Sequence, residues 1–325
     1  MTRPTLVRLG AYLVGLLVVF AGAAGFGRAV GSVPVTASKT GPAAATAGQG
    51  NGHGETAGGH EETAGGHGKA AGGQAAGGHG EAADGHLPGG LQVSQDGYRL
   101  TPVTTTLTAG STTDLAFRIT GPDGAPVTRY TPTHERDLHL IVVRRDLTGF
   151  QHVHPALGAD GTWRIPLTVA TAGQYRIFTD FQPAGRTAPL TLGVDLPAPG
   201  GYAPAALPAP SHTMAVDGYT VDLSGDLTAG TESTLTLRIS RDGTPVTDLQ
   251  PYLGAYGHLV ALRDGDLAYL HVHPDGGPGD GRTAAGPAVT FVADVPSAGP
   301  YRLYLDFQHA GRVHTAEFTA VAADK

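Results

Sequence analysis

The stretch TAGQYRIFTDFQPAGR, residues 171–186, returns later in the chain as SAGPYRLYLDFQHAGR, residues 297–312. A Gly-x-Tyr that opens an alternating apolar run is typical of the tyrosine corner of immunoglobulin-like β-sandwiches. We therefore expect Tyr175 and Tyr301 to form one such corner each. Because the whole stretch is repeated, the sequence predicts two sandwiches in tandem.

Landmarks on the N-terminal side of these stretches also recur in one order. Each copy has an Asp-Gly-Tyr and then an alternating run, LAFRI at residues 115–119 and LTLRI at 235–239, as a half-buried strand requires. Gly, Pro and Asp separate the short apolar stretches, and no long amphipathic helix is evident. This pattern predicts an all-β fold of two tandem immunoglobulin-like β-sandwiches.

Composition suggests where each sandwich begins and ends. We expect the first sandwich over residues 89–197, a Pro/Ala-rich linker over 198–211 and the second sandwich over 212–325. The second copy is slightly longer, most simply through an insertion in the Gly/Pro-rich loop at 275–286, since sandwiches tolerate insertions in loops.

The first 88 residues have a different composition. Arg3 and Arg8 precede an uncharged run long enough to span a bilayer, so residues 1–28 are expected to be a transmembrane anchor with its N-terminus inside. A cleaved signal peptide is the alternative, because small residues follow the apolar run. Residues 29–88 lack apolar periodicity and are expected to form a disordered His-rich stalk. Either way the sandwiches would lie outside the cytoplasm, tethered to the cell membrane or secreted.

Charge and composition limit the chemistry of any ligand site. The net charge of −7 gives no indication of nucleic-acid binding. The chain has no cysteine and only two methionines, Met1 and Met214, so thiolate sites and disulfides are excluded. A bound metal would be held by imidazole and carboxylate, which favours Cu(II) or Zn(II) over Cu(I).

A second repeated stretch supplies such groups. HLIVVRRDLTGFQHVHP, residues 139–155, matches HLVALRDGDLAYLHVHP, residues 258–274, and the three histidines keep their spacing. Each stretch reads as a β-hairpin that ends at the proline. Because strand side chains alternate, the two histidines of each His-x-His project on one face and form half of a metal site.

The sequence leaves two questions about these sites open. The first histidine of each hairpin is followed by apolar residues at its own parity, so His139 and His258 face either the core or the His-x-His face. Asp180 and Asp306 have the parity opposite to the corner tyrosines and are expected to face outward, on the strand next to these histidines. His134, in the first copy alone, is a further candidate. The predicted metal ligands are His139, His152, His154, Asp180, His258, His271, His273, Asp306, His309 and His314.

The pattern HL-x(5)-DL-x(2)-F-x-H-x-HP resembles extracytoplasmic bacterial proteins of copper and heavy-metal handling, with immunoglobulin-like or cupredoxin-like domains of the copper-resistance type. The resemblance covers the two hairpins and the corner strands. It implies metal binding or trafficking, with a metal-transport or cell-surface protein as partner. Copper-resistance domains often add methionine ligands, which this chain lacks.

The function predicted from these observations is non-catalytic binding of Cu(II) or Zn(II) outside the cytoplasm. No Gly-x-Ser-x-Gly, His-Glu-x-x-His or phosphate loop is present, so nothing beyond histidines indicates an enzyme. A structural or adhesive cell-surface module, with hydrogen-bonded histidines, is the first alternative. A metal-dependent enzyme is the second, because three histidines with an open position can activate water.

Overall fold

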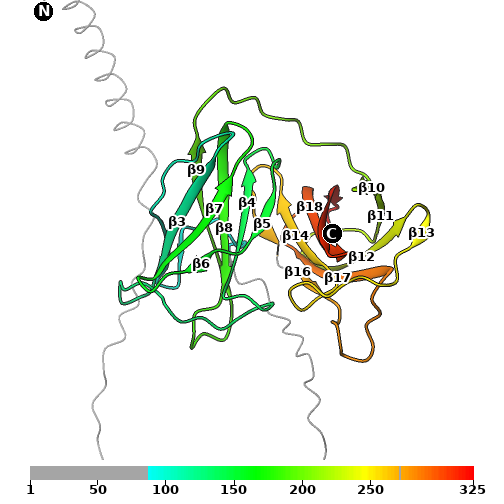
Figure 1. The fold of residues 1–325 in the computed structure, drawn as a ribbon. Helices are drawn as coiled ribbons and strands as arrows, with labels where there is room; N and C mark the ends of the chain where they lie inside the picture. Colours follow the sequence, from blue (N-terminus) through cyan, green and yellow to red (C-terminus); the bar gives the residue numbers. More distant parts are fainter. Residues whose placement is uncertain (1–86, 271) are drawn as a thin grey trace, which may run out of the picture. The chain divides into compact units, whose positions relative to one another are not determined.

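The computed structural model describes residues 87–270 and 272–325, and every regular element in them is a β-strand (Figure 1). The predicted membrane anchor (1–28), nearly all of the predicted stalk (29–86) and His271 lie outside the described residues. Among the described residues there is no helix with the length and hydropathy needed to cross a bilayer.

The first sandwich consists of two antiparallel sheets with strand orders β1-β2-β3-β7-β6 and β5-β4-β8-β9. Its strands are β1 (Ser94–Gln95), β2 (Tyr98–Pro102), β3 (Thr112–Thr120), β4 (Leu138–Arg144), β5 (Gln151–Val153), β6 (Ala156–Leu157), β7 (Thr162–Thr168), β8 (Gly173–Phe181) and β9 (Leu190–Ala198).

The second sandwich repeats this arrangement, with orders β10-β11-β12-β17-β16, where β13 also pairs with β12, and β15-β14-β18-β19. Its strands are β10 (Thr213–Val216), β11 (Tyr219–Ser224), β12 (Thr231–Arg241), β13 (Thr244–Pro245), β14 (His258–Arg263), β15 (Tyr269–Leu270), β16 (Val272–Pro274), β17 (Ala288–Val295), β18 (Gly299–His309) and β19 (Arg312–Ala322). The predicted all-β fold of tandem sandwiches is confirmed.

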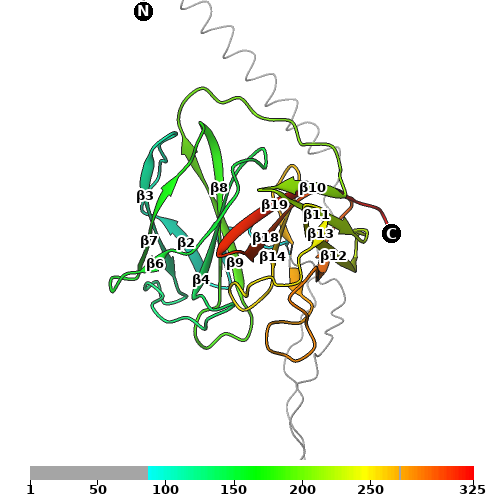
Figure 2. The same cartoon turned by 45° about the vertical axis from the view of Figure 1, so that its right-hand side comes forward.

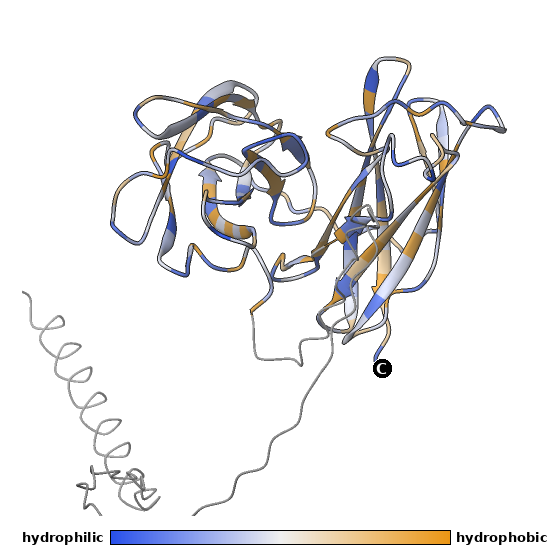
Figure 3. Ribbon diagram, turned by 90° about the horizontal axis from the view of Figure 1, so that it is seen from below, coloured by the Kyte–Doolittle hydropathy of each residue, from blue (hydrophilic) through white to orange (hydrophobic). Residues whose placement is uncertain are grey.

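Each sandwich encloses its own apolar core, and the tyrosine corners lie inside it. Tyr175 belongs to the first core and Tyr301 to the second, each at most 2% exposed. The hydroxyl of Tyr175 donates to the carbonyl of Thr171 at 2.8 Å, and that of Tyr301 to the carbonyl of Ser297 at 2.8 Å. The corner prediction is confirmed in both copies. Hydrophobic and hydrophilic segments are interspersed along the ribbons, as expected when one face of a strand is buried (Figure 3).

A third apolar cluster, which we call the interface cluster, joins the two sandwiches. Its buried members are Ile141, Val143, Leu147 and Phe178 of the first sandwich and Val260, Leu262, Leu267 and Tyr304 of the second. The Tyr304 ring stacks on Phe150 with centroids 3.9 Å apart, and its hydroxyl donates to the Leu147 carbonyl at 2.7 Å. Strands β4 and β8 consequently lie beside β14 and β18 (Figures 1 and 2).

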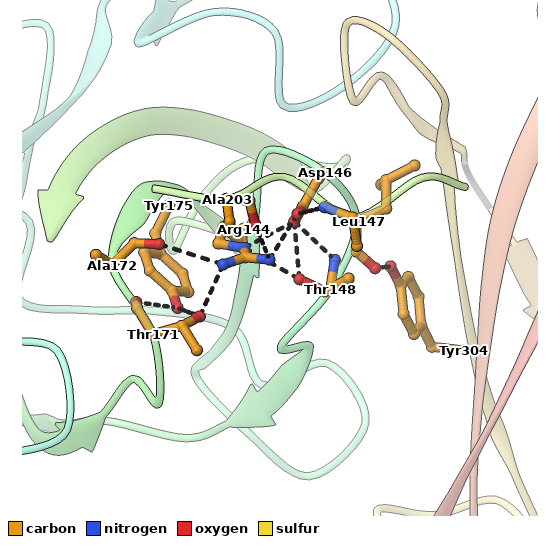
Figure 4. Close-up of polar contacts among 10 residues, drawn as sticks. Arg144, Asp146, Leu147, Thr148, Thr171, Ala172, Tyr175, Ala203 and Tyr304 are labelled. Carbon is orange, nitrogen blue, oxygen red and sulfur yellow. Dashed lines mark hydrogen bonds and ion pairs between the residues drawn. The ribbon is translucent and has the colours of Figure 1, made fainter. Parts of the chain in front are cut away.

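Arg144, at the end of β4, holds the turn after this strand close to the corner loop (Figure 4). Its guanidinium donates to the Asp146 carboxylate at 2.6 Å and to the Thr171 hydroxyl at 2.8 Å. The Asp146 carboxylate also accepts the backbone N–H of Ala205, in the segment that connects the sandwiches, at 2.8 Å. These bonds order the hairpin turn that carries Leu147 to the interface cluster.

Candidate functional site

The three histidines of the first hairpin converge on one point. Leu140 pairs with Val153 across β4 and β5, so His139 faces the His-x-His pair rather than the core. Nδ1 of His139 lies 3.0 Å from Nε2 of His152 and 3.1 Å from Nε2 of His154. The question left open by strand parity is thereby answered for the first copy.

The apolar residues that made this parity ambiguous are buried by the other sandwich. Leu140 and Val142 pack in the first core, whereas Ile141 and Val143 belong to the interface cluster. All seven residues of β4 are therefore buried, although they point to both faces of the sheet. His139 shares the interface face with Ile141, which explains why apolar residues follow it at its own parity.

Hydrogen bonds outside the triad determine which ring nitrogens are free to bind a ligand. Nε2 of His139 lies 2.9 Å from the carbonyl oxygen of Thr133, which can only accept, so His139 carries its proton on Nε2. Nδ1 of His152 lies 2.9 Å from a carboxylate oxygen of Asp306 and donates to it. When both rings are neutral, Nδ1 of His139 and Nε2 of His152 carry no proton, and their lone pairs point at each other across 3.0 Å.

The spacing of the three nitrogens suits a single ion. The ligand atoms of His139, His152 and His154 all lie within 4.8 Å of one another. Three nitrogens bound tetrahedrally at the usual zinc–nitrogen length would be about 3.3 Å apart. The two closest separations, 3.0 and 3.1 Å, are near that value.

Burial keeps two rings of this cluster neutral. It lowers the pKa of His139 to about 3, and the neighbouring histidines lower it further while the Thr133 carbonyl opposes the shift. Burial, with the positive charge that His152 and Arg136 can carry, lowers the pKa of His154 to about 4. Both rings are thus unprotonated at neutral pH and able to donate a lone pair to a metal.

Asp306 contacts the triad from the second sandwich. It lies on β18, pairs with His258 of β14 and is only 4% exposed. One carboxylate oxygen accepts the His152 ring N–H, and the other accepts the hydroxyl of Thr315 at 2.6 Å. We expected Asp306 to face outward beside the histidines of its own copy. It does point away from its own core, but the first sandwich covers it and its histidine partner belongs to that sandwich.

Asp180, the corresponding residue of the first copy, does not bind the triad. It pairs with His139 in the sheet, and its carboxylate accepts the hydroxyl of Thr191 at 3.3 Å. Burial raises the pKa of Asp180 to about 6. It contributes to the wall of a cavity next to the triad, without a hydrogen bond to the three ligand histidines.

In the second copy, the described hairpin histidines, His258 and His273, are arranged differently. Nε2 of His258 lies 2.8 Å from the carbonyl of Tyr252, as His139 does with Thr133, and burial lowers the His258 pKa to about 4. His273, however, lies on β16, which pairs with β17 in the other sheet. Within residues 87–270 and 272–325, one group of three potential ligands is close enough to share an ion, and it is the triad of the first copy. His271 lies outside the described residues.

A cavity of about 270 Å³ lies between the triad and the second-copy histidines. The His134 ring is 5.3 Å from that of His258 and 6.0 Å from that of His139, measured between centroids. Burial, and the positive charge that His273 and His152 can carry, lower the pKa of His134. The residues around the cavity are Thr133, His134, His139, His152, Asp180, Pro189, His258, Leu259, Val260, Tyr269, Val272, His273 and Pro274.

The remaining predicted ligands, His309 and His314, lie apart from the triad, around Tyr219. Nδ1 of His309 is 2.7 Å from the Tyr219 hydroxyl, and its Nε2 is 3.0 Å from the Asp248 carboxylate. Nδ1 of His314 lies 2.8 Å from the Asp217 carboxylate. Both ring nitrogens of His309 therefore take part in hydrogen bonds, as expected if these histidines have a structural role.

Sequence reasoning missed the carbonyl that orients His139. Thr133 and Arg136 close a tight turn by two backbone hydrogen bonds, with His134 and Glu135 at positive φ between them. Such turns usually contain Asn-Gly or Asp-Gly, and His-Glu gives no comparable signal. A comparable turn precedes His258, so the carbonyl acceptor is a feature of both copies.

Residues 92–196 and 214–324 each match the model of a protein family described as a domain of unknown function, DUF8832. The chain belongs to this family. The two DUF8832 domains correspond to the two sandwiches and together make up more than half of the chain. No curated protein sequence matches it.

Three solved structures give weak similarity to the pair of DUF8832 domains. The FdeC adhesin of Escherichia coli is 16% identical over 71% of this chain and 65% of its own, with a TM-score of 0.24. The Yersinia pseudotuberculosis adhesin InvE is 15% identical over 70% and 60%, with a TM-score of 0.20. Invasin, a bacterial integrin-binding protein, is 12% identical over 72% and 41%, with a TM-score of 0.21. The chain thus spans less than two thirds of their lengths, and TM-scores this low carry no conclusion about function.

Proposed function

We propose that this protein binds one divalent transition metal ion, Zn(II) or Cu(II), through His139, His152 and His154. The observation that carries the proposal is the convergence of three ring nitrogens: His139 Nδ1 lies 3.0 Å from His152 Nε2 and 3.1 Å from His154 Nε2. The opposite nitrogens of His139 and His152 are held by the Thr133 carbonyl and the Asp306 carboxylate. Lone pairs that converge at this distance repel each other unless a cation lies between them.

A metal ion suits this arrangement better than a proton shared by two rings, because the metal gains three nitrogen ligands at once. Burial lowers the pKa of His139 to about 3, so this ring offers its lone pair to a metal at neutral pH.

The surroundings of the triad match those of known metal sites. Metal-binding histidines usually donate their second ring N–H to a carbonyl or carboxylate, as His139 does to Thr133 and His152 to Asp306. Nitrogen ligands without sulfur suit Zn(II) and Cu(II). We propose binding without catalysis, on the extracytoplasmic side of a membrane, the side being inferred from the sequence of residues 1–28.

A structural or adhesive surface module is the second candidate. The interface cluster favours it, because eight buried apolar residues hold the two sandwiches together without any contribution from a ligand. The hydrogen bonds of His309 to Tyr219 and of His314 to Asp217 are also what this candidate function would require of the histidines.

Titration calorimetry with Zn(II) and Cu(II) on residues 87–325, which contain both sandwich cores, separates the two candidates. This fragment omits the stalk histidines, which would add weak binding. We expect one equivalent to bind tightly, and His152→Ala together with His154→Ala to remove it. His309→Ala is the matched control and should bind normally. Absence of saturable binding to the fragment would leave the surface module as the function.

A further inference from the structure

Asp306 belongs to the second sandwich, yet it orients a ligand of the first. Its carboxylate lies 2.9 Å from Nδ1 of His152, and both side chains are 5% exposed. Thr315 donates to the second carboxylate oxygen and restricts its rotation. We infer that metal binding by the triad is coupled, through Asp306, to the docking of the two sandwiches. This inference rests on the proposed metal site.

The carboxylate affects the ligand in two ways. It accepts the Nδ1 proton, so that Nε2 of His152 keeps its lone pair toward His139, and its negative charge makes that nitrogen a stronger donor. Loss of such an outer partner typically weakens metal binding by about 10-fold to 100-fold. His139 has no such dependence on the second sandwich, because its acceptor, Thr133, lies in the first.

The docked faces carry two kinds of contact, the apolar interface cluster and the hydrogen bond between His152 and Asp306. Leu267, 0% exposed in the turn between β14 and β15, contributes to that cluster at the end of the hairpin opposite His258. Docking can therefore be weakened without touching a ligand, and Asp306 can be changed without touching the interface cluster.

Coupling of this kind is reciprocal. If docking raises the affinity of the triad for a metal by some factor, metal binding stabilises the docked arrangement by the same factor. The second sandwich then positions a ligand of a site whose three ligands all lie in the first sandwich. Asp306 and His152 meet because each projects from the sheet face that its copy buries against the other copy.

A double-mutant cycle on residues 87–325 tests the coupling, with Zn(II) affinity measured by competition with a chromophoric chelator at pH 7.5. The variants are Asp306→Asn, Leu267→Asp and the double variant. Leu267 has a φ of 63°, which aspartate tolerates better than leucine, so the turn should form while a charge opposes docking. Asp222→Asn, an exposed carboxylate that accepts from Thr213, is the control.

We expect each single variant to lower the Zn(II) affinity about 10-fold to 100-fold, and the double variant to be no weaker than the weaker single one. Circular dichroism should show both sandwiches folded in every variant. Wild-type affinity in Asp306→Asn, or a double variant whose loss is the product of the single losses, would overturn the coupling while leaving the metal site intact. A wild-type fragment without Zn(II) affinity would overturn the proposed function itself, and the coupling with it.

Discussion

The hairpins of the two sandwiches have the same histidine spacing but different strand pairing. In the first, β5 stays with β4 as far as Val153, and the chain changes sheet only at β6, after His154. In the second, Tyr269 and Leu270 of β15 pair with β14, whereas β16, from Val272 onward and including His273, pairs with β17 of the other sheet. The first hairpin thus keeps its histidines together, and the second separates His273 from the sheet of His258.

Within the described residues, the repeated ligand motif therefore forms one three-histidine group and not two. A few residues of sheet pairing decide whether two histidines of one motif share a face with a third. The second copy still contributes to the site of the first through Asp306, so the two copies have different roles although their folds match.

The two hairpins should differ most when the first histidine of each is replaced. His139→Ala should lower Zn(II) affinity at least about 100-fold, because it removes one of three ligands. His258→Ala should change the affinity less than about 5-fold, since no ligand is lost. Calorimetry on residues 87–325 measures both variants, and circular dichroism checks folding. Equal losses would mean that the two copies share one set of ligands.

The two hairpins should behave alike in acid when metal is absent. Burial lowers the pKa of His139 to about 3 and of His258 to about 4, so the unfolded chain, with ordinary histidines near 6.5, binds protons first as the pH falls. Stability is then complete above about pH 6.5 and decreases below it, by up to about 2 kcal/mol per histidine at pH 5.

Urea unfolding with a chelator present, at pH 7.5 and pH 5.0, measures this loss. His139→Gln and His258→Gln should each reduce the dependence on pH by a similar amount, because the two rings are equally buried. A stability that does not change between these pH values would contradict the assignment of both rings as buried and neutral.

The two tyrosine corners have the same geometry, so the two copies should respond alike when they are changed. Tyr175→Phe and Tyr301→Phe each remove a hydroxyl that donates to a backbone carbonyl at 2.8 Å. Each should lower the free energy of unfolding by about 1 to 1.5 kcal/mol. Urea denaturation of the two variants is the measurement. A loss confined to one copy would show that the corners are not equivalent.

The smallest expected effect concerns the contact between the copies. Tyr304→Phe removes the hydrogen bond to the Leu147 carbonyl but keeps the ring stacked on Phe150. We expect a loss of about 0.5 to 1 kcal/mol in the stability of the docked pair. Thermal unfolding of residues 87–325 detects it, and Zn(II) affinity should fall slightly in parallel. A gain in stability would argue against this hydrogen bond.

Much of the fold was accessible from the sequence because its signals are local. The alternation at residues 115–119 and 235–239, the Gly-x-Tyr corners and the hairpins around the His-x-His pairs each depend on neighbours a few positions apart. Because the sequence is repeated, the same elements are expected in both copies. The convergence of His152 and His154 on one face followed in the same way.

The rest of the site depends on contacts between residues far apart in the chain. Ile141 and Val143 looked like core residues because nothing local distinguishes a strand face buried in a core from one buried by a second domain. The pairing of β4 with β5 decides that His139 joins the triad, and burial against the second sandwich brings Asp306, and not Asp180, to the His152 ring N–H. His309 and His314 lie elsewhere, around Tyr219.

Two β-sandwiches, their tyrosine corners and a His-x-His strand in each follow from the amino-acid sequence, since alternation and turn chemistry act over a few residues. The single triad of the described residues, and its contact with the second sandwich, follow from the packing of distant segments. The physical reason is that side-chain partners 154 residues apart, such as His152 and Asp306, meet only after both sandwiches have folded and buried a common apolar face.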